Sequence, residues 1–286
     1  MFTCILLLLI CIANNQVVSD GARYGLLLWY KDVLPLLLPF IIVSNLLVSK
    51  LDKNKSARQS KSIGLLCLLG LLCGYPLGAK LACDLCKRGY LSTKIANRLL
   101  PMCNNISPMF LSGYIGHIIL RDQYSFVFLL SMLYLPYLIF IGLSFFFFPI
   151  RNTTNHFSAP KNENISCEEN ELLLSCVIQI TYVGIYIMLC SILLAFIRTL
   201  PYISACQCDF LCGLTEVTQG TKAICLSSYS SDIKTALILG CTSFGGICAF
   251  LQTIQVTKQS GLSMSYYILV KLLCATATGW MCYLII

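Results

Sequence analysis

The stretch LGLLCGYPLGAKLACDLCKRGYL, residues 69–91, begins as an apolar segment and then breaks. Gly74, Pro76 and Gly78 interrupt the apolar pattern, and Lys80 follows directly. Glycine and proline both disfavour a continuous helix. Inside a bilayer, backbone that is freed from a helix must be buried in protein or line a wet cavity. The stretch therefore predicts an interrupted membrane segment whose broken backbone lies inside the protein.

The rest of the chain has the composition of a membrane protein. Of its 286 residues, 57% are hydrophobic and 11% are charged, whereas soluble domains average about 25% charged residues. Apolar runs of roughly twenty residues, the length that spans a bilayer, recur along the chain. The sequence lacks the short segments of alternating hydrophobicity that are typical of a β-barrel. We therefore expect an all-α polytopic membrane protein.

Charge and motifs exclude several function classes. The net charge of +8 comes from basic residues between apolar segments, which is typical of membrane orientation rather than of nucleic-acid binding. Many of the 18 cysteines lie in apolar runs, so we expect reduced thiols rather than disulfides or a metal site. No nucleotide-binding, serine-hydrolase, zinc-protease or dinucleotide motif occurs. We expect neither an enzyme nor a cofactor.

Two basic loops set the orientation of the first half. Residues 50–61 and 80–98 are both rich in lysine and arginine, and the apolar segment 62–79 lies between them. Short basic loops are cytoplasmic, and a single crossing would put these two on opposite faces. The conflict disappears if the segment turns near residues 74–78 and returns to the same side. The sequence therefore predicts a re-entrant hairpin near residues 62–98.

Counting spans from this hairpin predicts a second one of opposite orientation. The expected organisation is a short N-terminal membrane helix at 1–22, which is retained rather than cleaved, a first transport repeat at 23–150, a polar loop at 151–170, and a second transport repeat at 171–286 with its hairpin near 203–226. Each of these two inverted repeats would contain a re-entrant hairpin and broken or polar-interrupted helices. Paired interruptions in two halves are a pointer to a substrate site in transporters.

Polar residues inside apolar segments are the candidate binding residues, because they are costly in a bilayer. They fall in the first turn, in CNNISP, in GLTEVTQGTK and in GCTSFGG. The set is Gly74, Tyr75, Pro76, Gly78, Lys80, Asn104, Asn105, Ser107, Glu216, Thr218 and Ser243. The alternatives are structural: a snorkelling lysine, hydrogen bonds between helices for Asn and Ser, an ion pair of Glu216 with Lys222 or Lys234, and close helix packing at the glycines.

Three stretches resemble a known family. They are GLLLWYKDVLPLLLPFIIVSNLL, GYPLGAKLACDLCKRGYLSTKIANRLLPMCNNISPMFLSGYIG and GLTEVTQGTKA, and they are similar to the YlbJ-type sporulation integral membrane proteins. The resemblance implies a nucleoside-recognition or gate domain, similar to the core of concentrative nucleoside transporters. In that core the substrate sits between two hairpin tips and the broken helices that follow them. The family is implicated in moving dipicolinic acid toward the developing spore.

The first hairpin departs from the nucleoside transporters, which carry acidic residues there. None lies at residues 74–79, which argues against a sodium–nucleoside mechanism and suits a dianion, because a carboxylate would repel it. Lys80 and hairpin N–H groups would attract it instead.

We therefore predict a transporter that moves a small anionic solute, dipicolinic acid, by alternating access. Its location would be the cell membrane of a spore-forming bacterium, around the forespore. Its other partners would be the lipid bilayer and a coupling cation or proton, with oligomerisation left open. The alternatives are a transporter of nucleosides or other small metabolites, and a non-transporting assembly factor for spore formation.

Overall fold

The computed structural model describes residues 2–51, 59–87, 89–149, 169–258 and 260–286. Within these ranges every regular element is a helix and no strand occurs. Four helical segments are long and apolar enough to cross a membrane: Phe126–Phe147, Leu173–Arg198, Ser231–Thr257 and Met264–Ile285. A fifth candidate is a pair of helices bent by 58°. The predicted class, an all-α polytopic membrane protein, is confirmed.

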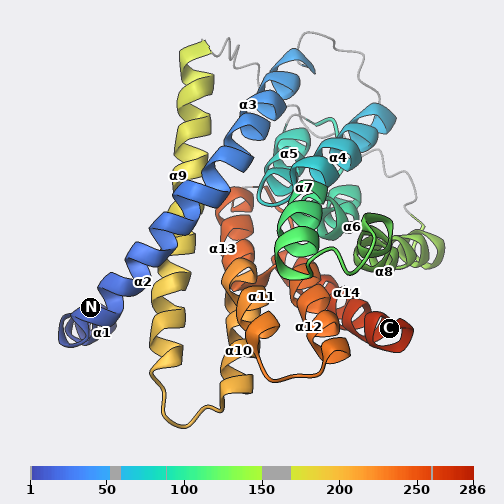
Figure 1. Cartoon of the computed structure of the whole chain (residues 1–286). Coiled ribbons are helices and arrows are strands. Elements are labelled where there is room, and N and C mark those ends of the chain that lie inside the picture. The colour runs from blue at the N-terminus through green and yellow to red at the C-terminus, as the bar shows by residue number, and fades with distance from the viewer. Residues whose placement is uncertain (1, 52–58, 88, 150–168, 259) are drawn as a thin grey trace.

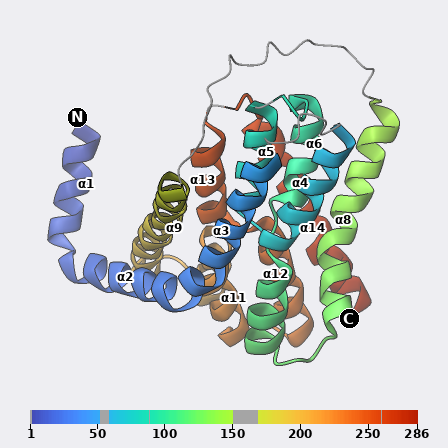
Figure 2. The ribbon, with the colours of Figure 1, turned by 90° about the horizontal axis from the view of Figure 1, so that it is seen from above.

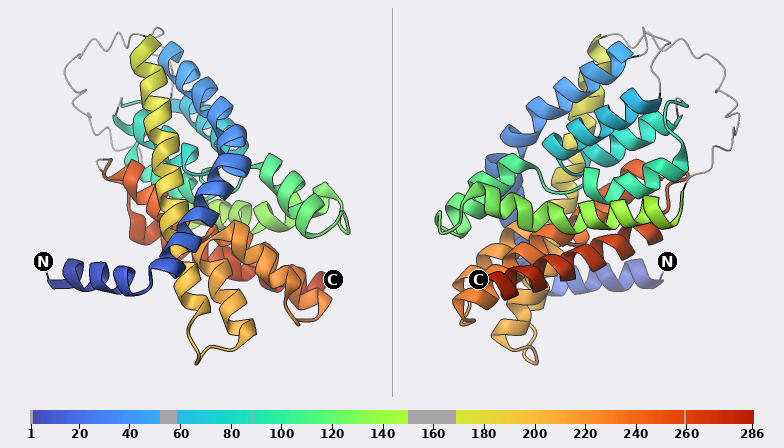
Figure 3. Two further views of the ribbon diagram at one scale, coloured as in Figure 1. Left: turned by 60° about the vertical axis from the view of Figure 1, so that its left-hand side comes forward. Right: turned by 90° about the vertical axis from the view of Figure 1, so that its right-hand side faces the viewer.

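The N-terminal region is a chain of connected helices. α1 (Phe2–Ala13) is followed by α2 (Asn15–Leu28), the short π-helix η1 (Trp29–Val33) and α3 (Leu34–Leu51). α1 projects away from the body of the molecule (Figures 2 and 3). With 12 residues it is shorter than the roughly 20 that a bilayer span needs. The boundary expected at residue 22 falls inside α2.

The opening stretch forms two helices around a tight turn. α4 (Gln59–Cys73) and α5 (Leu77–Lys87) pack against each other and are joined by residues 74–76. Gly74 has a φ of 73°, a conformation that side chains rarely adopt. A Cβ at Gly74 would also lie 2.8 Å from the backbone nitrogen of Ser107. The interruption therefore occurs where the sequence predicts it, and glycine permits the close approach.

A broken helix follows this first hairpin. α6 (Thr93–Cys103) is followed by a non-helical break at residues 104–107. A new helix then begins as α7 (Pro108–Phe110) and continues as the π-helix η2 (Leu111–Ile119). The hydroxyl of Ser107 accepts a hydrogen bond from the backbone N–H of Phe110 at 3.2 Å, which caps the new helix. α8 (Phe126–Phe147) completes the first half.

The second half repeats the same order of elements. α9 (Glu169–Arg198) leads into α10 (Ala205–Thr215) and α11 (Val217–Leu226), which are separated by Glu216 alone. α12 (Ser231–Phe244) and α13 (Gly246–Thr257) form a second broken helix around Gly245, whose φ is 86°. α14 (Met264–Ile285) ends the chain. Most of the expected polar loop at 151–170 lies outside the described residues.

Two of the contacts that elements of the first half make with the second half have counterparts in the opposite direction. α5 of the first hairpin packs on α13, and α11 of the second hairpin packs on η2. In the same way α6 packs on α14, and α12 packs on α8. The hairpins reach the centre of the molecule from opposite ends (Figures 1 and 3). The two inverted repeats, the re-entrant hairpins and their orientation in a bilayer stay predictions.

Long-range hydrogen bonds identify the two ends. At one end Arg98 of α6 donates to the carbonyl of Ser144 on α8 at 3.2 Å, and Asn97 accepts from the N–H of Ser263 at 2.8 Å. At the other end the thiol of Cys225 on α11 contacts the carbonyl of Ile119 at 3.4 Å. The first end is the one near the basic residues that the sequence assigns to the cytoplasm.

Candidate functional site

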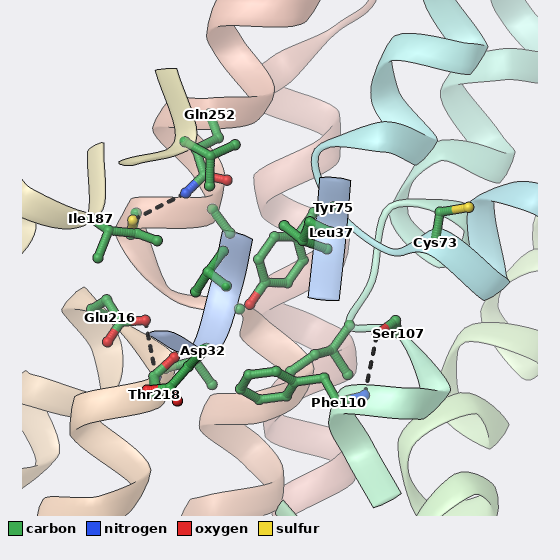
Figure 4. A pocket seen from close by; sticks show the side chains of 17 residues that line it. Asp32, Leu37, Cys73, Tyr75, Ser107, Phe110, Ile187, Glu216, Thr218 and Gln252 are labelled. Atoms are coloured by element: carbon green, nitrogen blue, oxygen red, sulfur yellow. Dashed lines mark hydrogen bonds between the residues drawn. The ribbon is translucent and has the colours of Figure 1, made fainter. Parts of the chain in front are cut away.

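An internal cavity lies where both hairpin turns and both helix breaks meet (Figure 4). The first turn contributes Tyr75, the first break Ser107, the second turn Glu216 and Thr218, and the second break Gly245. Other lining residues come from η1, α3, α4, α7, α9, α11 and α13. The volume of about 60 Å³ has room for several water molecules. We call this space the central cavity.

Glu216 is the residue that separates α10 from α11. Its side chain is only 4% exposed. Oε1 accepts a hydrogen bond from the N–H of Thr218 at 3.0 Å, and Oε2 accepts one from the N–H of Gln219 at 2.8 Å. The N-terminus of α11 therefore stabilises the carboxylate. Among the described residues Glu216 forms no ion pair with Lys222 or Lys234, so the surface-pair alternative does not describe this glutamate.

Tyr75, Ser107 and Thr218 surround the same space. The hydroxyl of Tyr75 points toward the side of the cavity where Glu216 and Asp32 lie (Figure 4). The carbonyl of Thr218 accepts a hydrogen bond from the Tyr114 hydroxyl at 2.7 Å, which ties the second turn to η2. Four residues of the predicted set, Tyr75, Ser107, Glu216 and Thr218, are thus brought together at the central cavity.

Asp32 also lines the central cavity, and the sequence interpretation missed it. It lies on η1, within an apolar run of the sequence. A lone acidic residue in such a run is itself a signal of function, so the information was present. The described lining contains two carboxyl groups, from Asp32 and Glu216, and no lysine or arginine. The cavity therefore favours positive charge or hydrogen-bond donors.

A second cavity lies beside the first, with a volume of about 360 Å³. Its lining includes Pro76, Lys80 and Lys87. Lys80 Nζ donates to Asn45 Oδ1 and to Gln179 Oε1, both at 2.9 Å. Two of the predicted residues, Pro76 and Lys80, thus lie in this second cavity and not in the central one.

Val183 and Gln252 line both cavities. The two spaces therefore adjoin at these two side chains, which we call the partition.

Asn104 is buried behind the central cavity and joins three elements. Oδ1 accepts a hydrogen bond from the N–H of Ala79 at 3.1 Å. Nδ2 donates to Thr253 Oγ1 at 2.8 Å and to the Tyr267 hydroxyl at 3.0 Å. The geometry of Asn104 matches the structural alternative, hydrogen bonding between helices.

The remaining predicted residues also lie outside the lining. Gly74 and Gly78 allow close backbone contact, and a Cβ on Gly78 would collide with the carbonyl of Cys103. Asn105 and Ser243 are buried at the two helix breaks. Both contact Lys271, a residue that the sequence interpretation missed. The signal was again a single charged residue in an apolar segment.

No group of three or more His, Cys, Asp or Glu side chains that could hold a metal ion occurs in the described part of the chain. The cysteines whose side chains the structure describes are free thiols and form no disulfide with one another.

Comparison with known proteins finds one partial likeness. No family model matches the chain, and no solved structure matches it. Over 116 residues the chain is 28% identical to the sporulation integral membrane protein YlbJ of Bacillus subtilis (strain 168). The match covers 37% of this chain and 28% of the length of that protein. Together with the apolar helices, this likeness supports an integral membrane protein.

Proposed function

We propose that this protein is a sporulation membrane transporter that moves dipicolinic acid across the membrane around the forespore by alternating access. One observation carries the proposal: both hairpin turns and both helix breaks line a single internal cavity. Interrupted helices that meet inside a membrane protein are the usual setting of a transporter substrate site. The partial likeness to a sporulation membrane protein supports the biological setting.

The two carboxyl groups of the central cavity would repel an anionic substrate, so binding an anion there requires a compensating positive charge or proton. Dipicolinic acid carries two carboxylates, which Asp32 and Glu216 would repel when all are ionised. A proton shared between Glu216 and one substrate carboxylate reduces this repulsion, because two adjacent carboxyl groups bind one proton tightly. The second substrate carboxylate and Asp32 keep their charges. We therefore include proton coupling in the proposal, with Glu216 as the residue that carries the proton.

The second cavity supplies the attraction that the central cavity lacks. Lys80 and Lys87 line it together with Asp84, and an excess of basic side chains along a cavity raises the local concentration of an anion. This cavity lies beside the central one, across Val183 and Gln252. In the proposed route the anion is first held near the lysines and then passes this partition.

Flux into liposomes tests the proposal. Purified protein is reconstituted, and dipicolinate uptake is followed with and without an inward proton gradient. We expect uptake above that of empty vesicles, accelerated by the gradient. Glu216→Gln should abolish the acceleration, whereas Asp232→Asn, at an exposed position of α12, should not. Uptake equal to that of empty vesicles contradicts transport of dipicolinate and leaves the assembly-factor alternative.

A second candidate function is favoured by the lining itself. The described lining holds no basic side chain, and it includes the aromatic rings of Tyr75 and Phe110. Aromatic rings stack on a planar base, and carboxylates accept hydrogen bonds from its amino groups. A nucleoside or another small uncharged metabolite fits these features. In the same vesicles, inhibition of dipicolinate uptake by nucleosides, or nucleoside uptake alone, would favour this candidate.

A further inference from the structure

Lys271 is a charged residue buried inside the helix bundle. It lies on α14, and its side chain is 2% exposed. Nζ donates to Oδ1 of Asn105 at 3.1 Å and to the backbone carbonyl of Ser243 at 2.8 Å. Asn105 belongs to the first helix break, and Ser243 lies in the last turn of α12, beside the second. One lysine therefore connects the two broken helices.

The surroundings of this lysine are neutral oxygens and an aromatic ring. Both hydrogen-bond acceptors are uncharged, and no carboxylate is among the partners that the described residues provide. Nζ also lies 5.3 Å from the centroid of the Tyr137 ring. A ring face attracts a cation and repels a lone pair. The two oxygens and the ring face can thus accommodate an ammonium group.

The acceptors belong to the group that binds metal cations in other transporters. Carbonyls at the C-terminal ends of half-helices and in unwound segments commonly coordinate a coupling sodium ion. The carbonyl of Ser243 is such a group, because the last four carbonyls of a helix have no partner within it. The Tyr137 hydroxyl also donates to this carbonyl at 2.9 Å, and the hydroxyls of Tyr137 and Thr278 lie 3.1 Å and 3.3 Å from Ser243 Oγ.

We propose that Lys271 is a built-in cation which occupies the place of a coupling sodium ion between the two broken helices. Its ammonium group satisfies the oxygens that a free ion would otherwise bind, and it holds the two breaks together permanently. This junction then binds no metal ion, and any coupling of transport is left to the carboxyl groups of the central cavity.

Thermal stability in detergent tests this proposal without reference to transport. The melting temperature is measured at constant ionic strength in sodium, potassium or choline chloride. The wild type should melt at the same temperature in all three salts. Lys271→Ala removes the ammonium and leaves space between the oxygens, so it should melt roughly 5 °C lower in choline. Sodium or potassium should restore much of the loss in a saturable manner.

Two variants provide the controls. Lys271→Met also removes the charge but fills the space with an apolar chain, so its melting temperature should fall and no salt should restore it. Lys222→Ala, at an exposed lysine of α11, should behave like the wild type. Equal salt recovery in the alanine and methionine variants would overturn the proposal, as would an alanine variant as stable as the wild type. If Lys271→Ala does not fold, the wild type decides: a saturable, sodium-specific rise in its melting temperature contradicts a built-in cation.

Discussion

Two buried polar side chains, Asn104 and Glu216, differ in what they contact. Asn104 has all its hydrogen-bonding groups paired with other helices and lies away from the central cavity. Glu216 is equally buried, yet it lies at the cavity and takes its hydrogen bonds from the start of its own helix. The burial of the two side chains is alike, so burial alone does not assign a role to either of them.

The first residue-scale prediction concerns Asn104. Asn104→Ala removes the acceptor of the Ala79 N–H and one partner each of the Thr253 and Tyr267 hydroxyls. Leaving buried groups unpaired should lower the free energy of unfolding by about 3 kcal/mol. Thermal unfolding in detergent measures this loss, with Asn15→Ala, at an exposed position of α2, as a control that should change little. An Asn104→Ala protein that is fully stable but transports nothing would show instead that Asn104 binds substrate.

The second residue-scale prediction concerns close packing of the first hairpin. A Cβ at Gly78 would collide with the carbonyl oxygen of Cys103, which is backbone and cannot rotate away. Gly78→Ala should therefore destabilise the protein by about 1–3 kcal/mol. Gly64, on the other helix of the same hairpin, has no atom within 4 Å of such a Cβ. Gly64→Ala should be neutral or stabilising by up to about 1 kcal/mol. Equal stability of the two variants would contradict the packing.

At the scale of elements, the interruptions could be predicted from the sequence and the side-chain partners could not. The pair of basic loops and the GYPLG turn indicated the first hairpin, because charge and backbone constraints act locally. The hydrogen bonds of Asn104 and Ser243 with other helices connect residues 25 to 163 positions apart. Periodicity does not say which helix a polar group will meet. Asp32 and Lys271 were missed because long apolar runs were read as plain spans.

The element-scale prediction concerns the second hairpin. α10 and α11 have 11 and 10 residues, too few to cross a bilayer that needs about 20. A protease-cleavable tag after Tyr202 and another after Ser228 should therefore be cut from the same side of oriented vesicles. A tag after Gly261, beyond the long α12–α13 span, should be cut from the other side.

Scrambled tags at these three sites should resist cleavage. If the tags after Tyr202 and Ser228 are cut from opposite sides, the segment crosses the membrane and the hairpin does not re-enter.

At the scale of the whole molecule, the two cavities divide charge between them. The central cavity holds the carboxyl groups of Asp32 and Glu216, and the second cavity holds Lys80 and Lys87 together with Asp84. A solute that passes both would meet basic side chains first when it comes from the end with the basic residues. The effect of a charge change should therefore depend on which cavity carries it and on the charge of the solute.

The whole-molecule prediction uses this division. Lys87→Glu reverses an exposed charge of the second cavity. The KM for dipicolinate should rise about three- to tenfold at low salt with kcat unchanged. The increase should shrink at high salt because exposed charges are screened. Lys94→Glu, an exposed lysine at the same end that does not line this cavity, is the control. A change in kcat alone would argue against a role in attracting the anion.

The partition made by Val183 and Gln252 has a consequence for speed. Both side chains are buried, at 3% and 5% exposed, and Gln252 Nε2 donates to Cys248 Sγ at 3.2 Å. Rotations within nanoseconds belong to exposed side chains, whereas movements of packed helices take microseconds to milliseconds. In the proposed route, exchange between the two cavities should therefore occur on the slower timescale, because α9 and α13, which carry the two side chains, must first move apart.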